Sequence, residues 1–408
     1  MTPDTARAIE AATELLCAPV LERMRAWRHD FHAHPETAFE EHRTAQKVAE
    51  VLQGLGLEIH RGLGGTGVVG TLRRGDGPVI GLRADMDALD MQELGTAGHC
   101  STIPGKMHGC GHDGHTAMLL GAAQRIVAEP GLRGTVHFIF QPAEENYGGA
   151  RVMLEDGLFE QFPCERVFAL HNAPNLPLGT FAIREGAMLS SSDTFEIRVI
   201  GRGSHAAQPE AGIDAVVTAS TLVGALQGIV SRNISAVDSL VLSITQIHGG
   251  DTWNVIPEAV TLRGTCRCFS PQVRQRARMR IDDICAGVAQ LSGARIEVDH
   301  FEGYPACVNS PAEAGLAAEA ARAVVGADAV NANTRPRMGS EDFAYMLERK
   351  PGAYILVGAA REGVDNPPVH NPYYDFNDDI LALGAAYWVT LTRNLLGADA
   401  PDATAQAA

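Results

Sequence analysis

The densest group of reactive side chains lies at residues 108–115, which read HGCGHDGH. Cys110 and His112 are two residues apart, so in an extended segment their side chains would project to the same side. A thiolate and an imidazole together suit Zn²⁺ and related transition metals. A polar loop with chance histidines is the alternative interpretation, because a Cys-x-His pattern is short. The motif therefore indicates a metal site only in combination with other ligands.

Two adjacent carboxylates, Glu144 and Glu145, follow the strand that we predict at residues 135–140. Open parallel sheets carry their functional sites at this end of their strands. Neighbouring side chains diverge, so one carboxylate can bind a metal while the other deprotonates a water molecule. A solvated pair of loop glutamates is the alternative, but the position at a strand end favours function.

Further candidates follow other predicted elements. Asp85 and Asp87 come at the end of a strand at residues 79–84, and His171 follows a strand at residues 166–170. His370 lies in a loop before the last helix. Each histidine taken alone is more often a structural residue. Together, four segments supply five plausible ligands, namely Cys110, His112, Glu145, His171 and His370. Five ligands exceed one tetrahedral site, so we expect two metals that share a bridging ligand and a water molecule.

The elements that must position these residues alternate between strands and helices. Helical patterns at residues 43–55 and 115–128 separate the strands of the first half. This spacing is typical of βαβ units and of a mainly parallel sheet. The pattern resumes late in the chain with a capping box at residues 310–313, a strand at 353–357 and a helix at 378–395.

The middle of the chain follows another order, strand-helix-strand-strand-helix-strand, which is typical of a ferredoxin-like sandwich. We therefore predict an α/β fold with two parts. Residues 1–189 and 303–408 form a catalytic metal-binding domain with a mainly parallel sheet. Residues 190–302 form an inserted ferredoxin-like α+β domain.

Composition limits the classes of partner. The 408 residues are 45% hydrophobic and 20% charged, as in a globular protein with a large core. The formal charge of −16 argues against binding to nucleic acid and to anionic membranes. No apolar run reaches the length of about 18 residues that a membrane span needs, and the first residues do not read as a signal peptide. With eight scattered cysteines, we expect a cytoplasmic protein with free thiols.

The chain resembles the M20 metallopeptidase family, and within it the amidohydrolase subgroup, which includes hippurate hydrolases, N-acyl-amino-acid amidohydrolases and auxin-conjugate hydrolases. The stretches that carry the resemblance occur in the family's order across nearly the whole chain. They are RHDFHAHPE at residues 28–36, LRADMDAL at 82–89, HGCGHDGHTAMLL at 108–120, QPAEE at 141–145, GSHAA at 203–207, NVIP at 254–257, GSEDF at 339–343 and HN at 370–371.

The resemblance implies a role for each matching position. The metal ligands would be Cys110, His112, Glu145, His171 and His370. They would hold two divalent metal ions, which could be Zn²⁺, Mn²⁺, Co²⁺ or Ni²⁺. Glu144 would be the general acid and base, and Asp87 would support the site without binding metal. Four residues would meet the substrate or line its pocket, namely His205, Asn254, Gly339 and Ser340. The inserted domain would act as a lid or in dimerisation, and we expect a homodimer or homotetramer.

The implied reaction is hydrolysis of the amide bond of an N-acyl amino acid, a hippurate-like small molecule, to a carboxylic acid and an amino acid. Because the metal ligands belong to the other domain, His205 must reach the substrate by domain closure or from a partner subunit. A dipeptidase or aminopeptidase of the same superfamily is the nearest alternative. A thiol hydrolase that uses Cys110 is a second alternative. A binding module without catalysis is a third alternative. Such a module would have lost a metal ligand or Glu144, and this sequence retains all of them.

Overall fold

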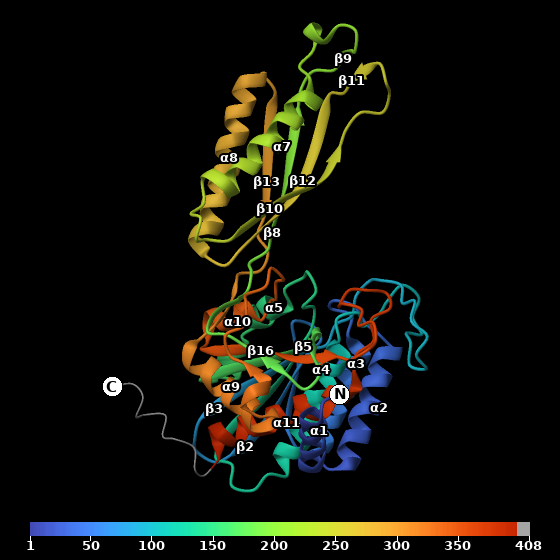
Figure 1. Cartoon of the computed structure of the whole chain (residues 1–408), viewed down its shortest axis with the longest axis vertical. Helices are drawn as coiled ribbons and strands as arrows, with labels where there is room; N and C mark the ends of the chain where they lie inside the picture. The colour runs from blue at the N-terminus through green and yellow to red at the C-terminus, as the bar shows by residue number, and fades with distance from the viewer. Residues whose placement is uncertain (398–408) are drawn as a thin grey trace, which may run out of the picture. The chain divides into compact units, whose positions relative to one another are not determined.

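The computed structural model describes residues 1–397. The chain forms two compact units, each with its own sheet (Figure 1). Unit 1 contains Met1–Met188, Val308–Arg335 and the chain from Asp342 onward. Unit 2 contains Leu189–Cys307 and Pro336–Glu341.

Unit 1 is built on an eight-stranded sheet in the order β1-β2-β4-β3-β5-β16-β6-β15. The strands are β1 (Glu58–Leu63), β2 (Gly67–Arg74), β3 (Val79–Asp85), β4 (Gly134–Gln141), β5 (Arg166–Pro177), β6 (Phe181–Ala182), β15 (Val330–Asn331) and β16 (Gly352–Ala360). The four central strands, β4, β3, β5 and β16, run parallel to one another. β2 pairs antiparallel with β4, which makes the sheet mixed. Two short strands, β7 (Gly186–Leu189) and β14 (Cys307–Asn309), pair separately.

The central strands are apolar along almost their whole length. Every residue of β4 is buried, and so are all but the last residue of β16 and all but the first of β3. Parallel strands need such sequences because helices of the crossover connections cover the sheet.

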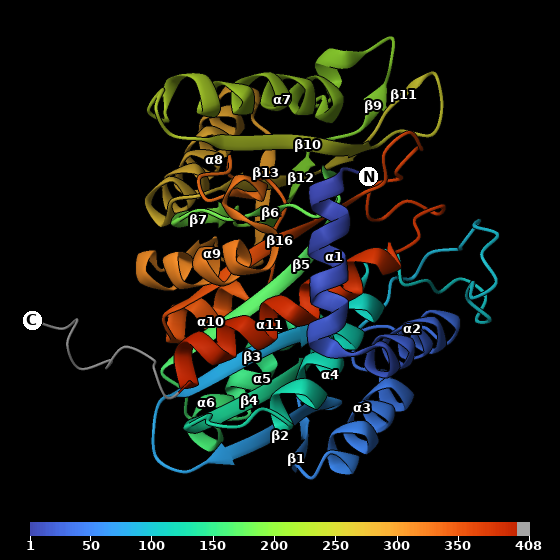
Figure 2. The ribbon, with the colours of Figure 1, turned by 60° about the horizontal axis from the view of Figure 1, so that its bottom comes forward.

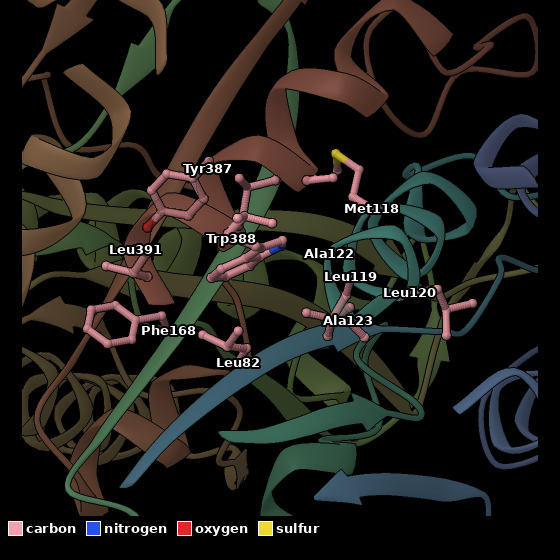
Figure 3. Packing of buried hydrophobic residues seen from close by; sticks show 14 of the residues in the cluster. Leu82, Met118, Leu119, Leu120, Ala122, Ala123, Phe168, Tyr387, Trp388 and Leu391 are labelled. Atoms are coloured by element: carbon pink, nitrogen blue, oxygen red, sulfur yellow. The ribbon is translucent and has the colours of Figure 1, made fainter. Parts of the chain in front are cut away.

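Helices pack against this sheet and against one another (Figure 2). They are α1 (Pro3–Leu16), α2 (Ala18–Ala33), α3 (His42–Gly54), α4 (His112–Val127), α5 (Gly149–Glu155), α6 (Leu158–Gln161), α9 (Pro311–Val325), α10 (Ala344–Arg349) and α11 (Leu381–Leu396), with 3-10 turns at Ala327–Ala329 and Asp378–Ile380. Figure 3 shows the core between α4, α11 and the sheet, where Leu82 and Phe168 of the strands face Trp388. All three side chains are fully buried. This core fixes the start of α4 relative to the strand ends.

The structure differs from the sequence-based elements at three places. α4 begins at His112, three residues before the predicted start, because Gly111 adopts a left-handed conformation (φ 97°) and caps the helix. β5 continues to Pro177, past His171, because it keeps pairing with β16. Ser310 precedes α9 but makes no side-chain capping bond, since its hydroxyl accepts from the N–H of Gly352 and Glu313 pairs with Arg166.

Unit 2 has the expected ferredoxin-like order. Its elements are β8 (Asp193–Ile200), β9 (Ser204–His205), the 3-10 turn Pro209–Ala211, α7 (Ala215–Arg232), β10 (Leu240–His248), β11 (Val255–Ile256), β12 (Ala259–Cys268), α8 (Pro271–Ser292) and β13 (Arg295–Phe301). The four long strands form an antiparallel sheet in the order β10-β12-β8-β13. Phe195, Ile197 and Val199 of β8 alternate with polar residues and are buried in the core under α7 and α8.

The predicted fold class is confirmed. Unit 1 has a mainly parallel sheet flanked by helices, and unit 2, which is inserted into it in the sequence, has a separate antiparallel sheet.

One helix, α7, has the length and mean hydropathy of a membrane span. Its Leu222, Leu226 and Ile229 belong to the core of unit 2, which explains its apolar character. Such a helix is weak evidence for a membrane because core helices share these properties.

Candidate metal centre

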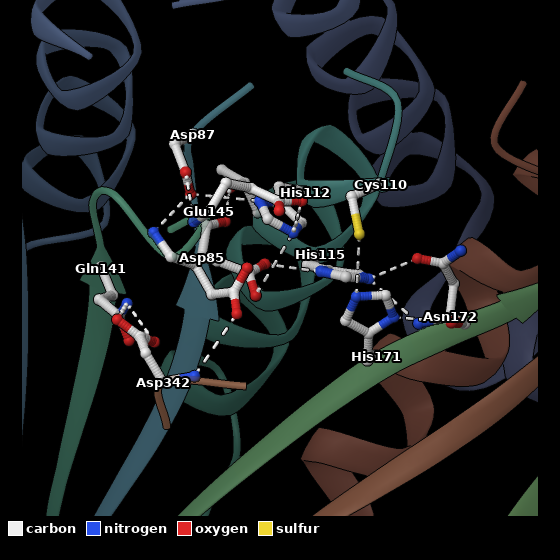
Figure 4. Close-up of polar contacts among 12 residues, drawn as sticks. Asp85, Asp87, Cys110, His112, His115, Gln141, Glu145, His171, Asn172 and Asp342 are labelled. Carbon is white, nitrogen blue, oxygen red and sulfur yellow. Dashed lines mark hydrogen bonds and ion pairs between the residues drawn. The ribbon is translucent and has the colours of Figure 1, made fainter. Parts of the chain in front are cut away.

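Adjacent parallel strands and the start of α4 bring together four of the predicted ligands, namely Cys110, His112, Glu145 and His171 (Figure 4). Glu144 and Glu145 follow β4, Asp87 follows β3, and His171 lies within β5. Cys110 and His112 do not lie in the extended segment that we predicted. Gly111 turns the chain between them, and His112 is the first residue of α4. The turn nevertheless keeps both side chains at one site.

Three overlapping groups of donor atoms form the centre. The groups are Cys110, His112 and His171; Cys110, Glu145 and His370; and His112, Glu144 and Glu145, and within each group the donor atoms lie within 4.8 Å of one another. The Sγ of Cys110 is 3.4 Å from Nε2 of His171, and Nε2 of His370 is 3.0 Å from Oε1 of Glu145. These separations fit ligands that share one ion at about 2.0–2.3 Å. All five predicted ligands therefore lie at one place.

The loop that carries Glu144 and Glu145 is tightly constrained. Ala143 and Asn146, on either side of the pair, have left-handed backbones with φ of 53° and 71°. Such conformations in residues other than glycine cost energy and persist only where the surroundings enforce them. Asp87 supplies part of that constraint, since its carboxylate accepts the N–H groups of Glu144 and Glu145 at 3.0 and 2.9 Å. The supporting role predicted for Asp87 thus has a geometric basis.

His112 is oriented by the same carboxylate. Its Nδ1 lies 3.3 Å from Oδ1 of Asp87, which leaves Nε2 directed toward Asp85 and Glu145 at 3.8 and 4.0 Å. Burial alone would lower the pKa of His112, but the carboxylates of Asp85, Asp87 and Glu145 raise it to about 10. A carboxylate that holds the far nitrogen of a ligating histidine is common in metal sites.

The surroundings of His171 and Cys110 favour the uncharged forms of these side chains, in contrast to those of His112. Burial and the neighbouring His115 hold the pKa of His171 well below its ordinary value. Its Nδ1–H donates to the carbonyl of Asn172 at 2.7 Å, so Nε2 faces Cys110 with its lone pair. Burial and the carboxylates of Glu145 and Glu144 raise the pKa of the Cys110 thiol well above its usual range. The carboxylates of Glu145 and Glu144 thus place negative charge beside this thiol, and a bound cation would offset it.

This donor set fits divalent metal ions. Thiolate, imidazole and carboxylate ligands together select borderline transition metals such as Zn²⁺. His370 completes the set from a separate loop, where it has a left-handed backbone (φ 63°) and its N–H donates to the carbonyl of Gly109 at 2.8 Å. A strained residue at this position is consistent with a functional constraint.

Sequence reasoning gave no role to a buried network behind the ligands. His115 joins Oδ1 of Asp85 at 2.6 Å and Oδ1 of Asn172 at 2.7 Å, and the amide of Asn172 donates to the hydroxyl of Tyr374 at 2.7 Å. Gly111 packs against this network, because a Cβ there would lie 2.5 Å from Oδ1 of Asn172. The spacing of His112 and His115, three residues apart on one helix face, was the available signal.

The other predicted site residues belong to unit 2. His205 in β9 is exposed, and Asn254 is held beside it because the N–H of Ala206 donates to the Asn254 carbonyl at 2.9 Å. Gly339 is exposed and accepts the N–H of Ser190 at 2.9 Å. Ser340, next to it, is half-buried. Their roles toward substrate stay predictions.

The chain is similar in sequence to a known protein family and to several known proteins. Residues 81–394 match the family model of Peptidase family M20/M25/M40. Hippurate hydrolase of Campylobacter jejuni is 40% identical over 370 residues, which cover 90% of this chain and 95% of that protein. N-acetylcysteine deacetylase of Bacillus subtilis is 38% identical over 372 residues, which cover 90% and 96%.

Solved structures are similar to this chain in fold. The Bacillus subtilis YXEP protein, described as a dinuclear metal-binding peptidase of the M20 family, superimposes with a TM-score of 0.80 at 33% identity. The match covers 93% of this chain and 99% of that one. The resemblance inferred from the sequence is therefore confirmed. The chain belongs to peptidase family M20, as one of its metal-dependent amidohydrolases that act on linear amides.

Proposed function

We propose that this enzyme hydrolyses the amide bond of N-acyl amino acids and uses two divalent metal ions held by Cys110, His112, Glu145, His171 and His370. The observation that carries the proposal is the overlap of the donor groups, because Cys110, His112 and Glu145 each belong to two of them and the set would hold more than one ion. The names of the relatives, hippurate hydrolase and N-acetylcysteine deacetylase, support an N-acyl amino acid as substrate. These two names imply different acyl groups, so the proposal covers N-acyl amino acids as a class and no single acyl group.

The reaction consumes one water molecule, forms a C–O bond and breaks the C–N bond. Bound metal ions would polarise the amide carbonyl and make water more acidic. Glu144 accepts the proton of the attacking water and returns it to the leaving nitrogen. Asp87 keeps that carboxylate in place through the backbone of the loop.

Residues of unit 2 contribute to substrate binding in this proposal. His205 donates a hydrogen bond to the carbonyl oxygen as it gains charge. Asn254 binds the carboxylate of the amino acid, and Gly339 and Ser340 line the pocket. These assignments rest on the matching sequence motifs.

The decisive experiment combines metal analysis with an activity panel. Protein purified without added metal is analysed for Zn, Mn, Co and Ni and is assayed on N-acetyl, N-benzoyl and indole-acetyl amino acids, with dipeptides as comparison. We expect bound metal, hydrolysis of N-acyl amino acids and a Glu144→Ala variant that keeps its metal but is slower by about 10²-fold or more. Preference for dipeptides with a free amine would favour the dipeptidase alternative.

The same panel tests the thiol-hydrolase alternative. A nucleophilic cysteine needs a lowered pKa, whereas burial and nearby carboxylates raise the pKa of Cys110. We expect a chelator to abolish activity and added metal to restore it. Full activity after complete metal removal would favour the thiol mechanism.

We further propose a cytoplasmic homodimer or homotetramer. In unit 2, β10 is an edge strand, and the exposed face of α7 beside it carries the uncharged residues Val217, Ser220, Thr221 and Gly224. Unpaired strand edges of this kind are available for pairing with a second chain. Light scattering after size-exclusion chromatography measures the state, and cell fractionation measures the location.

A further inference from the structure

Asp342 lies beside the loop that carries Glu144 and Glu145, and its side chain is fully buried. This loop segment, residues 141–150, includes the last residue of β4 and the first two residues of α5. The carboxylate of Asp342 contacts both ends of this loop. Gln141 Nε2 donates to its two oxygens at 2.8 and 2.9 Å, and the N–H of Ala150 donates to Oδ2 at 2.8 Å.

Asp342 also reaches the loop from its own backbone. Its N–H points to Oε1 of Glu144 at 3.4 Å. The carboxylate that holds the loop ends and the N–H that faces the general base therefore belong to one residue, which couples the loop geometry to the position of the base.

A buried cation holds Asp342 in turn. Nη2 of Arg83 lies 3.1 Å from Oδ1 of Asp342, and Nε of the same guanidinium donates to Oε1 of Gln141 at 2.7 Å. Arg83 is itself buried and also binds Asp85. A buried carboxylate with this many donors has a single low-energy orientation.

We infer that Asp342 is a positioning residue for Glu144, acting through the loop at residues 141–150. The inference rests on the proposed role of Glu144 as general base. It assigns to Asp342 neither a metal nor a substrate contact. Such control matters because displacing a catalytic group by about 1 Å can cost about 10²-fold in rate.

The variant that tests this is Asp342→Asn. An asparagine has one acceptor oxygen, so either the N–H of Ala150 or the guanidinium of Arg83 faces an amide donor instead. The matched control is Glu313→Gln, which removes the charge of another buried carboxylate paired with an arginine, Arg166, outside the metal centre. If Asp342→Asn does not fold, Gln141→Met detaches the start of the loop from the same carboxylate.

The first measurement is hydrogen exchange of the metal-free proteins. We expect peptides over residues 142–150 to lose protection in Asp342→Asn and to keep it in Glu313→Gln. Unchanged exchange in this loop overturns the inference. The result of this measurement does not depend on whether the protein cleaves N-acyl amino acids. It therefore tests the positioning role of Asp342 independently of the proposed function.

The second measurement is kinetic. On the best N-acyl amino acid, Asp342→Asn should lower kcat by about 10²-fold with KM nearly unchanged. In the Glu144→Ala background the same substitution should cause no further loss, because groups that act through one another are not additive. An equal loss in both backgrounds shows a purely structural role and overturns the inference. A wild-type protein that cleaves none of the substrates contradicts the proposed function instead.

Discussion

At the scale of single residues, Cys110 belongs to two of the donor groups of the centre, as do His112 and Glu145. We expect Cys110→Ser to lower the affinity for metal by about tenfold or more and to lower activity in parallel, since a hydroxyl is a far weaker ligand than a thiolate. Elemental analysis of the purified variant measures the occupancy. The matched control is Cys285→Ser, a buried thiol in the core of unit 2. Full metal occupancy in Cys110→Ser would contradict the assignment.

A second residue-scale prediction concerns pH. His32 is buried and lies 2.8 Å from Asp113 and 3.2 Å from Glu93. Burial alone would lower its pKa, but the hydrogen bond and charge of Asp113 raise the pKa of His32 from 6.5 to about 9. Because the folded value exceeds the unfolded one, this stabilisation is complete below about pH 6.5 and is lost as the pH rises through about 9.

The shift corresponds to roughly 3 kcal/mol of unfolding free energy. Urea denaturation of wild type and His32→Gln at about pH 6 and about pH 10 measures it. We expect the wild-type advantage to be larger at the lower pH. An advantage that is equal at both pH values would contradict this account.

At the scale of elements, the start of α4 decides the geometry of two ligands. Gly111 has φ of 97°, and a Cβ there would lie 2.5 Å from Oδ1 of Asn172 and 2.8 Å from the hydroxyl of Tyr374. Gly111→Ala should therefore destabilise the fold by at least about 1 kcal/mol and weaken metal binding, because the helix start must shift. Gly98→Ala is the control, since no heavy atom lies within 4 Å of a Cβ at that exposed glycine.

Thermal denaturation and metal titration of both variants test the prediction. Equal behaviour of Gly111→Ala and Gly98→Ala would show that the turn before α4 tolerates a side chain.

At the scale of the whole molecule, we propose that unit 2 contributes to catalysis through His205. We expect His205→Ala to lower kcat by about 10²-fold or more, as loss of an oxyanion donor does. Metal content and thermal stability should stay near wild type, because the His205 side chain is exposed and outside the donor groups. Unchanged kinetics would remove His205 from the mechanism.

Mixing the two impaired variants, Glu144→Ala and His205→Ala, then distinguishes two arrangements. Activity recovered after subunit exchange would show that His205 acts across a dimer. Absence of recovery, with exchange verified by a mass-tagged chain, would favour closure within one chain.

The sequence by itself predicted the central buried strands, several of the helices and the ligand types. Apolar runs predicted β3, β4 and β16, because a strand buried on both faces has no polar alternation. Ligand chemistry is local as well, so Cys110 and Glu145 could be named from residue type and position after an element. The family resemblance added the roles of Glu144 and Asp87.

Only the tertiary structure decided how these residues are held. The sequence did not reveal that Gly111 starts α4 early, because a left-handed cap depends on what packs against it. It also did not reveal the contacts of Asp342 and His115, because their partners Gln141 and Asn172 lie far along the chain. Hydrogen bonds between distant segments leave no periodic pattern in a sequence. Their geometry exists only once the sheet has brought the strand ends together.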